Sequence, residues 1–239
     1  MFYFLLPGLL SYNFILVAAA VVPAVFLMVK VYRSDRLESE SPYLLWTLIK
    51  AGVFSSLIAM VAERVLSGLL GAVAARNSAV YQVLLYFVVV AGSEEGAKFA
   101  LLYGKTWRSR EFNCQYDAVV YAVFVSLGFA LWENISYVLH YGFSTAVVRA
   151  LTAIPGHTCF GVFMGVFYGL ARRYENRGNR EAARVCGAMA VLAPALLHGA
   201  YDYIASVGTS SWGFIGFIAA LFAASYALVT RMSRTDRPI

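Results

Sequence analysis

The chain has 239 residues, of which 61% are hydrophobic and 13% are charged, and its mean hydropathy is +0.69. Because roughly a quarter of the residues in a soluble domain are charged, this composition excludes a soluble globular protein and indicates an integral membrane protein. A net charge of +6 would favour nucleic-acid binding in a soluble protein, but here the basic residues first report membrane topology, so no nucleic-acid partner is expected.

Apolar stretches of about 20 residues recur along the chain and predict an all-α polytopic membrane protein with about seven transmembrane helices. We expect a single integral membrane domain over residues 1–239, with a motif-bearing core at about 79–206. No positive charge precedes Lys30, so we expect no cleavable signal peptide and a first span that remains as an anchor. The predicted spans are 9–31, 43–63, 79–103, 115–139, 146–171, 184–206 and 212–230.

The basic residues are distributed unevenly among the breaks between these spans. The breaks after the first, third, fifth and seventh spans hold 14 of the 19 Lys and Arg residues. The other side of the membrane has only Arg64, Arg76 and Arg149. By the positive-inside rule, we expect a multi-pass protein of the cell membrane with its N-terminus outside and its C-terminus in the cytoplasm.

Ionisable side chains lie inside several spans, where a charge persists only if it faces other helices or water and has partners. The third span contains Glu94, Glu95 and Lys98, roughly 15 Å of helix from the nearest polar flank. Lys50 and Asp117 lie near the predicted cytoplasmic face, and we expect both to snorkel to it. The other polar groups within spans are Glu133, Asn134, His157, His198 and Asp202.

The depth of each group follows from the helical rise of about 1.5 Å per residue. Counted from the outer boundary, the depths are ~6 Å for Asp202, ~9 Å for Glu133, ~12 Å for His198, ~16 Å for His157 and ~22 Å for Glu94. Four helices are therefore expected to bring acidic and imidazole groups to the central and outer part of the membrane.

The spacing along each helix indicates which side chains cooperate. His198 and Asp202 are four residues apart, so the carboxylate can orient or charge the imidazole. Lys98 lies angularly between Glu94 and Glu95, so one glutamate can be paired while the other points at the site. Carboxylates that converge would need a shared proton or a cation between them. The sequence therefore predicts either an acid–base site with shifted carboxylate pKa values or a metal site. Transporters use the same residue types, so a proton- or ion-coupled membrane transporter is the alternative function, and a non-catalytic scaffold is a third.

Four short motifs follow one another along these spans: Glu94-Glu95-Gly-Ala-Lys98, Phe129-Ala-Leu-Trp-Glu133, Arg149 to His157, and His198-Gly-Ala-Tyr-Asp202. In this order they resemble the EExxK, FxxxE, histidine-containing and HxxxD motifs of the PrsW intramembrane proteases, relatives of the CAAX-prenyl endopeptidases. The resemblance covers roughly residues 90–205, and the ordered set is more specific than any single motif. The CAAX branch carries Arg and His where this chain has Lys98 and Glu133, which favours the PrsW branch and argues against a prenylated substrate.

The resemblance implies a membrane endopeptidase that performs site-one type cleavage of a single-span membrane protein in the lipid bilayer, within regulated intramembrane proteolysis. The substrate would typically be an anti-sigma factor, cut on its extracytoplasmic side. The implied roles are general base for Glu94 or Glu95, water binding for His157, oxyanion stabilisation for His198 oriented by Asp202, and metal binding or leaving-group protonation for Glu133, with Lys98 and Asn134 in support.

A metal ion is compatible with these residues. Zinc is the first choice, with Glu95, Glu133, His157 and His198 as its expected ligands. No HExxH motif occurs in the sequence, so a metal-free glutamate mechanism is the alternative.

Overall fold

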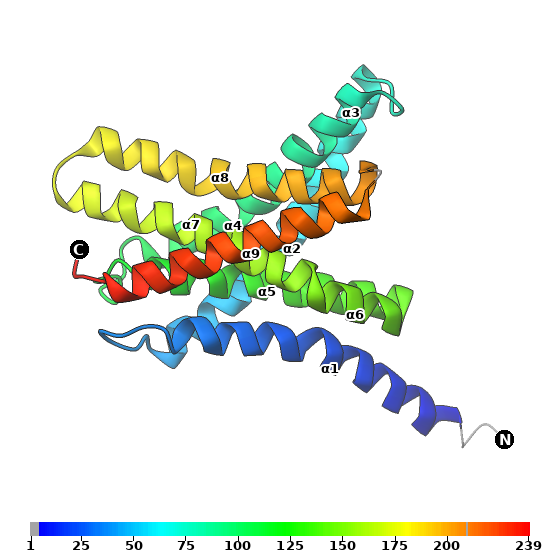
Figure 1. Ribbon diagram of the computed structural model, residues 1–239, viewed down its shortest axis with the longest axis horizontal. Coiled ribbons are helices and arrows are strands. Elements are labelled where there is room, and N and C mark those ends of the chain that lie inside the picture. The colour runs from blue at the N-terminus through cyan, green and yellow to red at the C-terminus, as the bar shows by residue number, and fades with distance from the viewer. Residues whose placement is uncertain (1–4, 209) are drawn as a thin grey trace.

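Helices make up most of the chain that this computed structural model describes, namely residues 5–208 and 210–239, with side chains from residue 14 onward (Figure 1). In chain order they are α1 (Leu5–Tyr32), α2 (Pro42–Val73), α3 (Ala79–Leu84), the π-helix η2 (Leu85–Val90), α4 (Ala91–Thr106), α5 (Asp117–Tyr141), α6 (Phe143–Leu151), α7 (Ala153–Asn176), α8 (Arg180–Val207) and α9 (Ser211–Arg234). Within those ranges the only β-pairing is a single bridge, so the predicted all-α fold is confirmed.

Six helical segments of the described chain are long and apolar enough to cross a membrane, and α6 with α7 forms one of them. The third predicted span is not among the six because it is divided into α3, η2 and α4, the longest of which has 16 residues. These three pieces follow one another without a break from Ala79 to Thr106. The predicted third span falls on this continuous helical run, and the six qualifying segments make the chain a multi-pass membrane protein.

The segments that contain most of the basic residues meet at one end of the bundle. The Ser41 amide donates to Glu111 Oε2 at 3.0 Å, and the Gln115 amide donates to the Arg237 carbonyl at 3.0 Å. The α1–α2 connection, the α4–α5 connection and the C-terminal tail therefore lie together. The α7–α8 turn lies at the same end as the C-terminus, to the left in Figure 1. The charge asymmetry thus marks one end of the molecule, and its cytoplasmic location stays a prediction.

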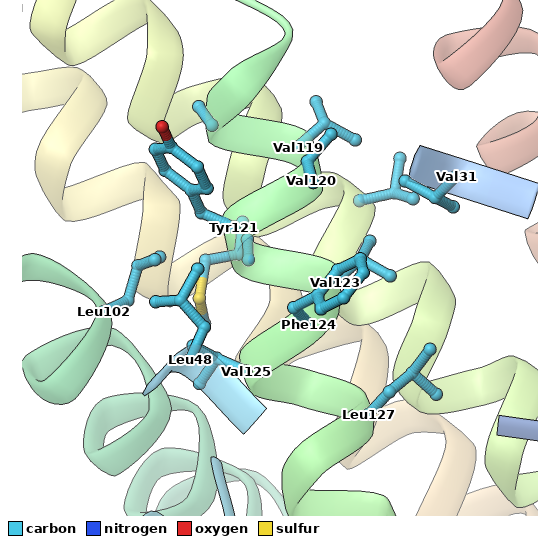
Figure 2. Packing of buried hydrophobic residues seen from close by; sticks show 14 of the residues in the cluster. Val31, Leu48, Leu102, Val119, Val120, Tyr121, Val123, Phe124, Val125 and Leu127 are labelled. Carbon is cyan, nitrogen blue, oxygen red and sulfur yellow. The ribbon is translucent and has the colours of Figure 1, made fainter. Parts of the chain in front are cut away.

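The central helix is α5, which is buried continuously from Asp117 to Ala130. Its apolar side chains pack with Val31 of α1, Leu48 of α2 and Leu102 of α4 (Figure 2). Glycines allow the neighbouring helices to approach its backbone. A Cβ atom added to Gly165 of α7 would lie 2.5 Å from the Val119 Cα, so only glycine fits there.

The contact between α2 and α5 is equally close. A Cβ on Gly52 would lie 2.1 Å from the Val125 carbonyl oxygen, and one on Gly128 would lie 2.4 Å from the Ile49 carbonyl oxygen. The two backbones therefore touch at Gly52 and Gly128. This crossing fixes the position of the α5 segment that follows Gly128, which includes Glu133.

Two expectations about the ends of the predicted spans are wrong. The second span was expected to end at residue 63, but α2 continues to Val73, and the α2–α3 hairpin projects beyond the other helices (Figure 1). Asp117 does not snorkel: it is fully buried, and its Oδ2 accepts hydrogen bonds from the Asn113 and Cys114 amides at 3.0 and 2.7 Å. Lys50, in contrast, is exposed on the surface of α2.

Candidate active site

Two glutamates and a lysine of α4 form the centre of a buried polar network. Lys98 is completely buried, and its Nζ donates to Glu95 Oε1 at 2.7 Å and to Glu94 Oε2 at 3.2 Å. The ammonium also lies 4.0 Å from the centre of the Phe129 ring of α5. The sequence suggested that one glutamate would be paired; the lysine pairs with both.

His157 connects this centre to α5. Its Nδ1 lies 3.3 Å from Lys98 Nζ, and its Nε2 lies 2.8 Å from Glu133 Oε2. Because an ammonium group can only donate, Nδ1 must accept, which assigns the ring proton to Nε2 and makes Glu133 its acceptor. The lysine and the glutamate together fix the tautomer of His157.

Glu133 is also held by a cation from α6. Arg149 Nη2 lies 2.9 Å from Glu133 Oε2, and the Arg149 Nε donates to Asn134 Oδ1. The guanidinium stacks over the Tyr137 ring, 4.0 Å from its centre. The break between α6 and α7 at Thr152 allows Arg149 and His157 to approach the same carboxylate from the two helices.

His198 of α8 lies between the two glutamates of α4 and Asp202 of its own helix. Its Nδ1 is 2.9 Å from Glu95 Oε1 and 3.8 Å from Glu94 Oε2, while its Nε2 is 3.4 Å from Asp202 Oδ2. The next residue, Gly199, packs against the π-helix: a Cβ there would lie 2.8 Å from the Phe87 Cα. This close contact brings α8 against η2 and places His198 beside the first turn of α4.

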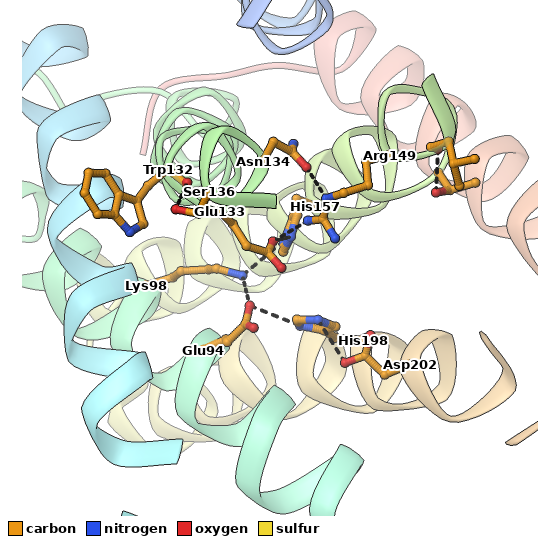
Figure 3. A network of polar contacts seen from close by, with 12 residues as sticks. Glu94, Lys98, Trp132, Glu133, Asn134, Ser136, Arg149, His157, His198 and Asp202 are labelled. Carbon is orange, nitrogen blue, oxygen red and sulfur yellow. Dashed lines mark hydrogen bonds and ion pairs between the residues drawn. The ribbon is translucent and has the colours of Figure 1, made fainter. Parts of the chain in front are cut away.

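The side chains of this network come from α4, α5, α6, α7 and α8 (Figure 3). It contains every residue that the sequence suggested for the site: Glu94, Glu95, Lys98, Glu133, Asn134, His157, His198 and Asp202. The expected depths of these groups in the membrane differ by up to roughly 16 Å. Side chains at such different depths could not contact one another directly, as they do here. The projecting α2–α3 hairpin explains this, because α3 begins farther out than assumed and the depth of Glu94 was overestimated.

A cavity of about 430 Å³ lies beside the network. Glu94, Glu133, His198 and Asp202 line it, whereas Glu95 and His157 do not. A larger cavity of about 660 Å³, bounded by α1, α7 and α9, is lined by none of these side chains and is not the candidate site.

Two residues of the 430 Å³ cavity were missed by sequence reasoning, Glu63 and Arg149. Glu63 was placed at the end of a span, because the hydropathy falls there, although α2 continues past it. Arg149 is a topology signal and the first residue of the third motif in the sequence analysis, which gives it no role in the site. Its position eight residues before His157, within the third motif, was the available signal for a role in the site.

Three residues could hold a metal ion. Glu94, Glu95 and His157 each offer one ligand atom, and these atoms lie within 4.8 Å of one another. This group shares Glu95 and His157 with the expected ligand set. Glu133, another expected ligand, bonds Nε2 of His157, whereas Nδ1 of the same ring faces Lys98.

All the residues of this network lie in the part of the chain that matches a known protein family. The sequence matches the PrsW family intramembrane metalloproteases over residues 40–229. The chain belongs to this family. Protease PrsW of Geobacillus kaustophilus (strain HTA426) is 32% identical over 229 residues, which cover 94% of this chain and 95% of that protein.

Other PrsW proteases are similar. Protease PrsW of Bacillus subtilis (strain 168) is 30% identical over 200 residues, or 83% of this chain and 86% of that protein. Protease PrsW of Clostridioides difficile (strain 630) is 35% identical over 130 residues, or 52% of this chain and 53% of that protein. No solved structure matches significantly. As a PrsW-family member, the chain is a membrane-embedded endopeptidase, and its substrate is a membrane protein in the lipid bilayer.

Proposed function

We propose that this endopeptidase performs site-one type cleavage of a single-span membrane protein, such as an anti-sigma factor, on its extracytoplasmic side. The observation that carries the proposal is the convergence of carboxylates and imidazoles from separate helices beside one cavity. Asp202 and Glu133 lie toward the ends of α8 and α5 that are opposite the basic end of the bundle. With the basic end in the cytoplasm, the cavity is nearer the extracytoplasmic face.

Glu94 is the better candidate for the general base. It lines the cavity, whereas Glu95 is fully buried and its Oε1 is bonded to both Lys98 and His198. Peptide hydrolysis in a membrane requires a water to be activated where bulk water is scarce, so the base must face the space that admits water. In this assignment Glu95 positions Lys98 and His198 for the reaction.

His198 is placed to stabilise the oxyanion. Both of its nitrogens face carboxylates, Glu95 on one side and Asp202 on the other, and this arrangement favours the doubly protonated, cationic ring. A cationic ring that lines the cavity can stabilise, through its charge, the oxygen of the tetrahedral intermediate, on which negative charge develops.

The contacts of Glu133 favour a positioning role. One of its oxygens already accepts from His157 and pairs with Arg149, so the carboxylate is held as an anion and is a poor proton donor. Glu133 would then orient His157, whose Nδ1 remains an acceptor on the side of Glu94 and Lys98.

The residues present fit a zinc ion. Carboxylate oxygens and imidazole nitrogens are both zinc donors, and Glu95 Oε2 is buried without a hydrogen-bond partner among the described residues. Glu94, Glu95 and His157 would hold the ion, in which case Glu94 would be a ligand in place of the free base, and a zinc ion bound there would supply Lewis-acid activation of water and of the scissile carbonyl. The Lys98 ammonium now bonds one atom of each of these residues, so it must withdraw for the ion to bind.

The test is cleavage of a purified single-span anti-sigma factor by the purified protein in detergent. Glu94→Ala, Glu95→Ala and His198→Ala should each lose at least about tenfold of the rate. Glu181→Ala, which changes an exposed glutamate at the start of α8, is the matched control and should keep it. Full activity in the three site variants, or no cleavage of any single-span substrate by the wild type, would contradict the proposal.

A further inference from the structure

Four carboxylates gather at the basic end of the bundle, where the α1–α2 connection meets the start of α5 and the C-terminal tail. One oxygen of each is held by a protein donor. Asp117 accepts from the Asn113 and Cys114 amides, as described above. The other pairs are Glu40 Oε2 with the Tyr121 hydroxyl at 2.7 Å, Asp35 Oδ1 with the Leu37 amide at 3.3 Å, and Asp236 Oδ1 with the Tyr116 amide at 2.8 Å.

The second oxygen of each carboxylate is buried and has no hydrogen-bond partner among the residues that the structure describes. Glu40 is only 3% exposed and Asp117 is 0% exposed. Within the described chain, none of the four forms an ion pair with Lys or Arg, although this end of the protein is rich in both. Buried carboxylates without a counter-ion are costly, and a bound cation would offset this cost.

The distances suit a metal ion. One carboxylate oxygen each from Asp35, Glu40 and Asp117 lies within 4.8 Å of the other two. Oxygens at about 2.4 Å from a Ca²⁺ ion can be at most ~4.8 Å apart, whereas Mg²⁺, with bonds of about 2.1 Å, requires a slightly tighter group. An all-oxygen, carboxylate-rich set selects such hard cations over zinc.

We propose that Asp35, Glu40 and Asp117 form a binding site for a hard divalent cation, Ca²⁺ or Mg²⁺, that joins the α1–α2 connection to the start of α5. This site is separate from the active site, because Asp117 and Glu133 lie sixteen residues apart on α5, or roughly 24 Å of helix. The ion stabilises the basic end of the bundle and takes no part in hydrolysis.

Terbium luminescence tests the proposal, with Tb³⁺ as a probe for Ca²⁺ sites. The Tyr121 hydroxyl is bonded directly to Glu40, so tyrosine excitation should sensitise Tb³⁺ bound to the chelator-washed, full-length protein in detergent. Ca²⁺ and Mg²⁺ are then titrated as competitors, and the one that displaces Tb³⁺ at the lower concentration is the preferred ion. Calcium or magnesium should also raise the Tm of the wild type relative to the chelated protein.

The variants Glu40→Gln and Asp117→Asn keep the side-chain shape and should weaken Tb³⁺ binding by about tenfold or more. Glu38→Gln, which changes an exposed glutamate of the same connection, is the matched control and should bind normally. Glu95→Gln should also bind normally, which separates this site from the active-site carboxylates. Asp35→Asn, in a less buried position, replaces Asp117→Asn if the latter does not fold.

Either of two results would overturn the proposal. The first is a wild-type protein that binds none of the three ions. The second is binding that is unaffected by Glu40→Gln, or that is lost in Glu95→Gln, since the ion would then lie elsewhere.

Discussion

The ammonium of Lys98 on α4 lies over the Phe129 ring of α5, 4.0 Å from its centre. The ring covers one side of the cation, Glu94, Glu95 and His157 contact it from others, and the lysine is completely buried. The lysine therefore serves as the internal counter-ion of the active-site glutamates.

Replacing Lys98 tests this role. Lys98→Met retains most of the side-chain volume but leaves two buried glutamates without a cation, which should lower the free energy of unfolding by about 3–5 kcal/mol. The measurement is thermal or denaturant unfolding in detergent. Lys50→Met, which removes an exposed lysine of α2, is the control and should unfold like the wild type. Equal stability of the two variants would show that the glutamates do not depend on the lysine.

The same variant bears on zinc. If the ammonium competes with a metal for Glu94, Glu95 and His157, Lys98→Met should contain at least as much zinc per chain as the wild type after purification without chelator. Elemental analysis measures this directly. A zinc content that falls in Lys98→Met but not in Lys50→Met would mean that the lysine supports the metal site.

The contact between α8 and the π-helix should control the position of His198. Gly199→Ala would place a Cβ 2.6 Å from Phe87 Cδ1 and 2.8 Å from its Cα, so α8 must move away from η2. A displacement of His198 by a fraction of an ångström to about 1 Å should reduce kcat roughly tenfold to hundredfold. Gly187→Ala, on the same helix with no atom within 4 Å of the added Cβ, is the control and should retain full activity.

The clustering of these side chains could be predicted from the sequence, because charged side chains in a membrane-spanning helix need partners. Glu94, Lys98, His198 and Asp202 stand out against apolar neighbours, and helical spacing places them on shared faces. The small residues that bring the helices together were harder to interpret. Nothing in the sequence shows that Gly199 meets Phe87, since this contact joins segments more than a hundred residues apart.

Two further features could not be predicted, for different reasons. The π-helix η2 has no hydropathy signal, because Leu85–Val90 is apolar whichever helical type it adopts. The burial of Asp117 depends on the loop that precedes it, where amides at Asn113 and Cys114 turn toward the carboxylate. Hydropathy locates the end of a span, but it does not show how the connecting loop folds over that end.

Arg149 should act through Glu133. Arg149→Lys keeps the charge but loses the planar group that pairs with Glu133, bonds Asn134 and stacks on Tyr137. We expect a fall in kcat of roughly tenfold with little change in KM, because Glu133 and His157 lose their orientation while the cavity keeps its shape. Steady-state kinetics with a peptide-tagged substrate measures both constants. Arg76→Lys, at an exposed position of the α2–α3 turn, should leave them unchanged.

The predicted orientation can be tested with reporter fusions. A green fluorescent protein fused after Ile239 should fluoresce, and alkaline phosphatase at the same position should be inactive, because the C-terminus is expected in the cytoplasm. Insertion of each reporter at Gly208, between α8 and α9, should give the opposite pattern. The reverse result at both positions would place the cavity nearer the cytoplasmic face and contradict extracytoplasmic cleavage.

Glu63 lies on α2, half-buried in the wall of the cavity, and the proposed chemistry does not use it. It forms no ion pair within the described part of the chain, so it is free to accept a hydrogen bond from a backbone amide of a bound substrate. Glu63→Gln keeps an acceptor oxygen but removes its charge, which weakens this hydrogen bond, so it should raise KM several-fold while kcat stays within about twofold of the wild type.

The control for this variant is Glu181→Gln, which changes an exposed glutamate outside the cavity and should alter neither constant. A large fall in kcat for Glu63→Gln would give this carboxylate a part in the chemical step. In that case α2 would contribute to catalysis together with α4, α7 and α8, and the assignment of the general base to Glu94 would have to be tested against Glu63.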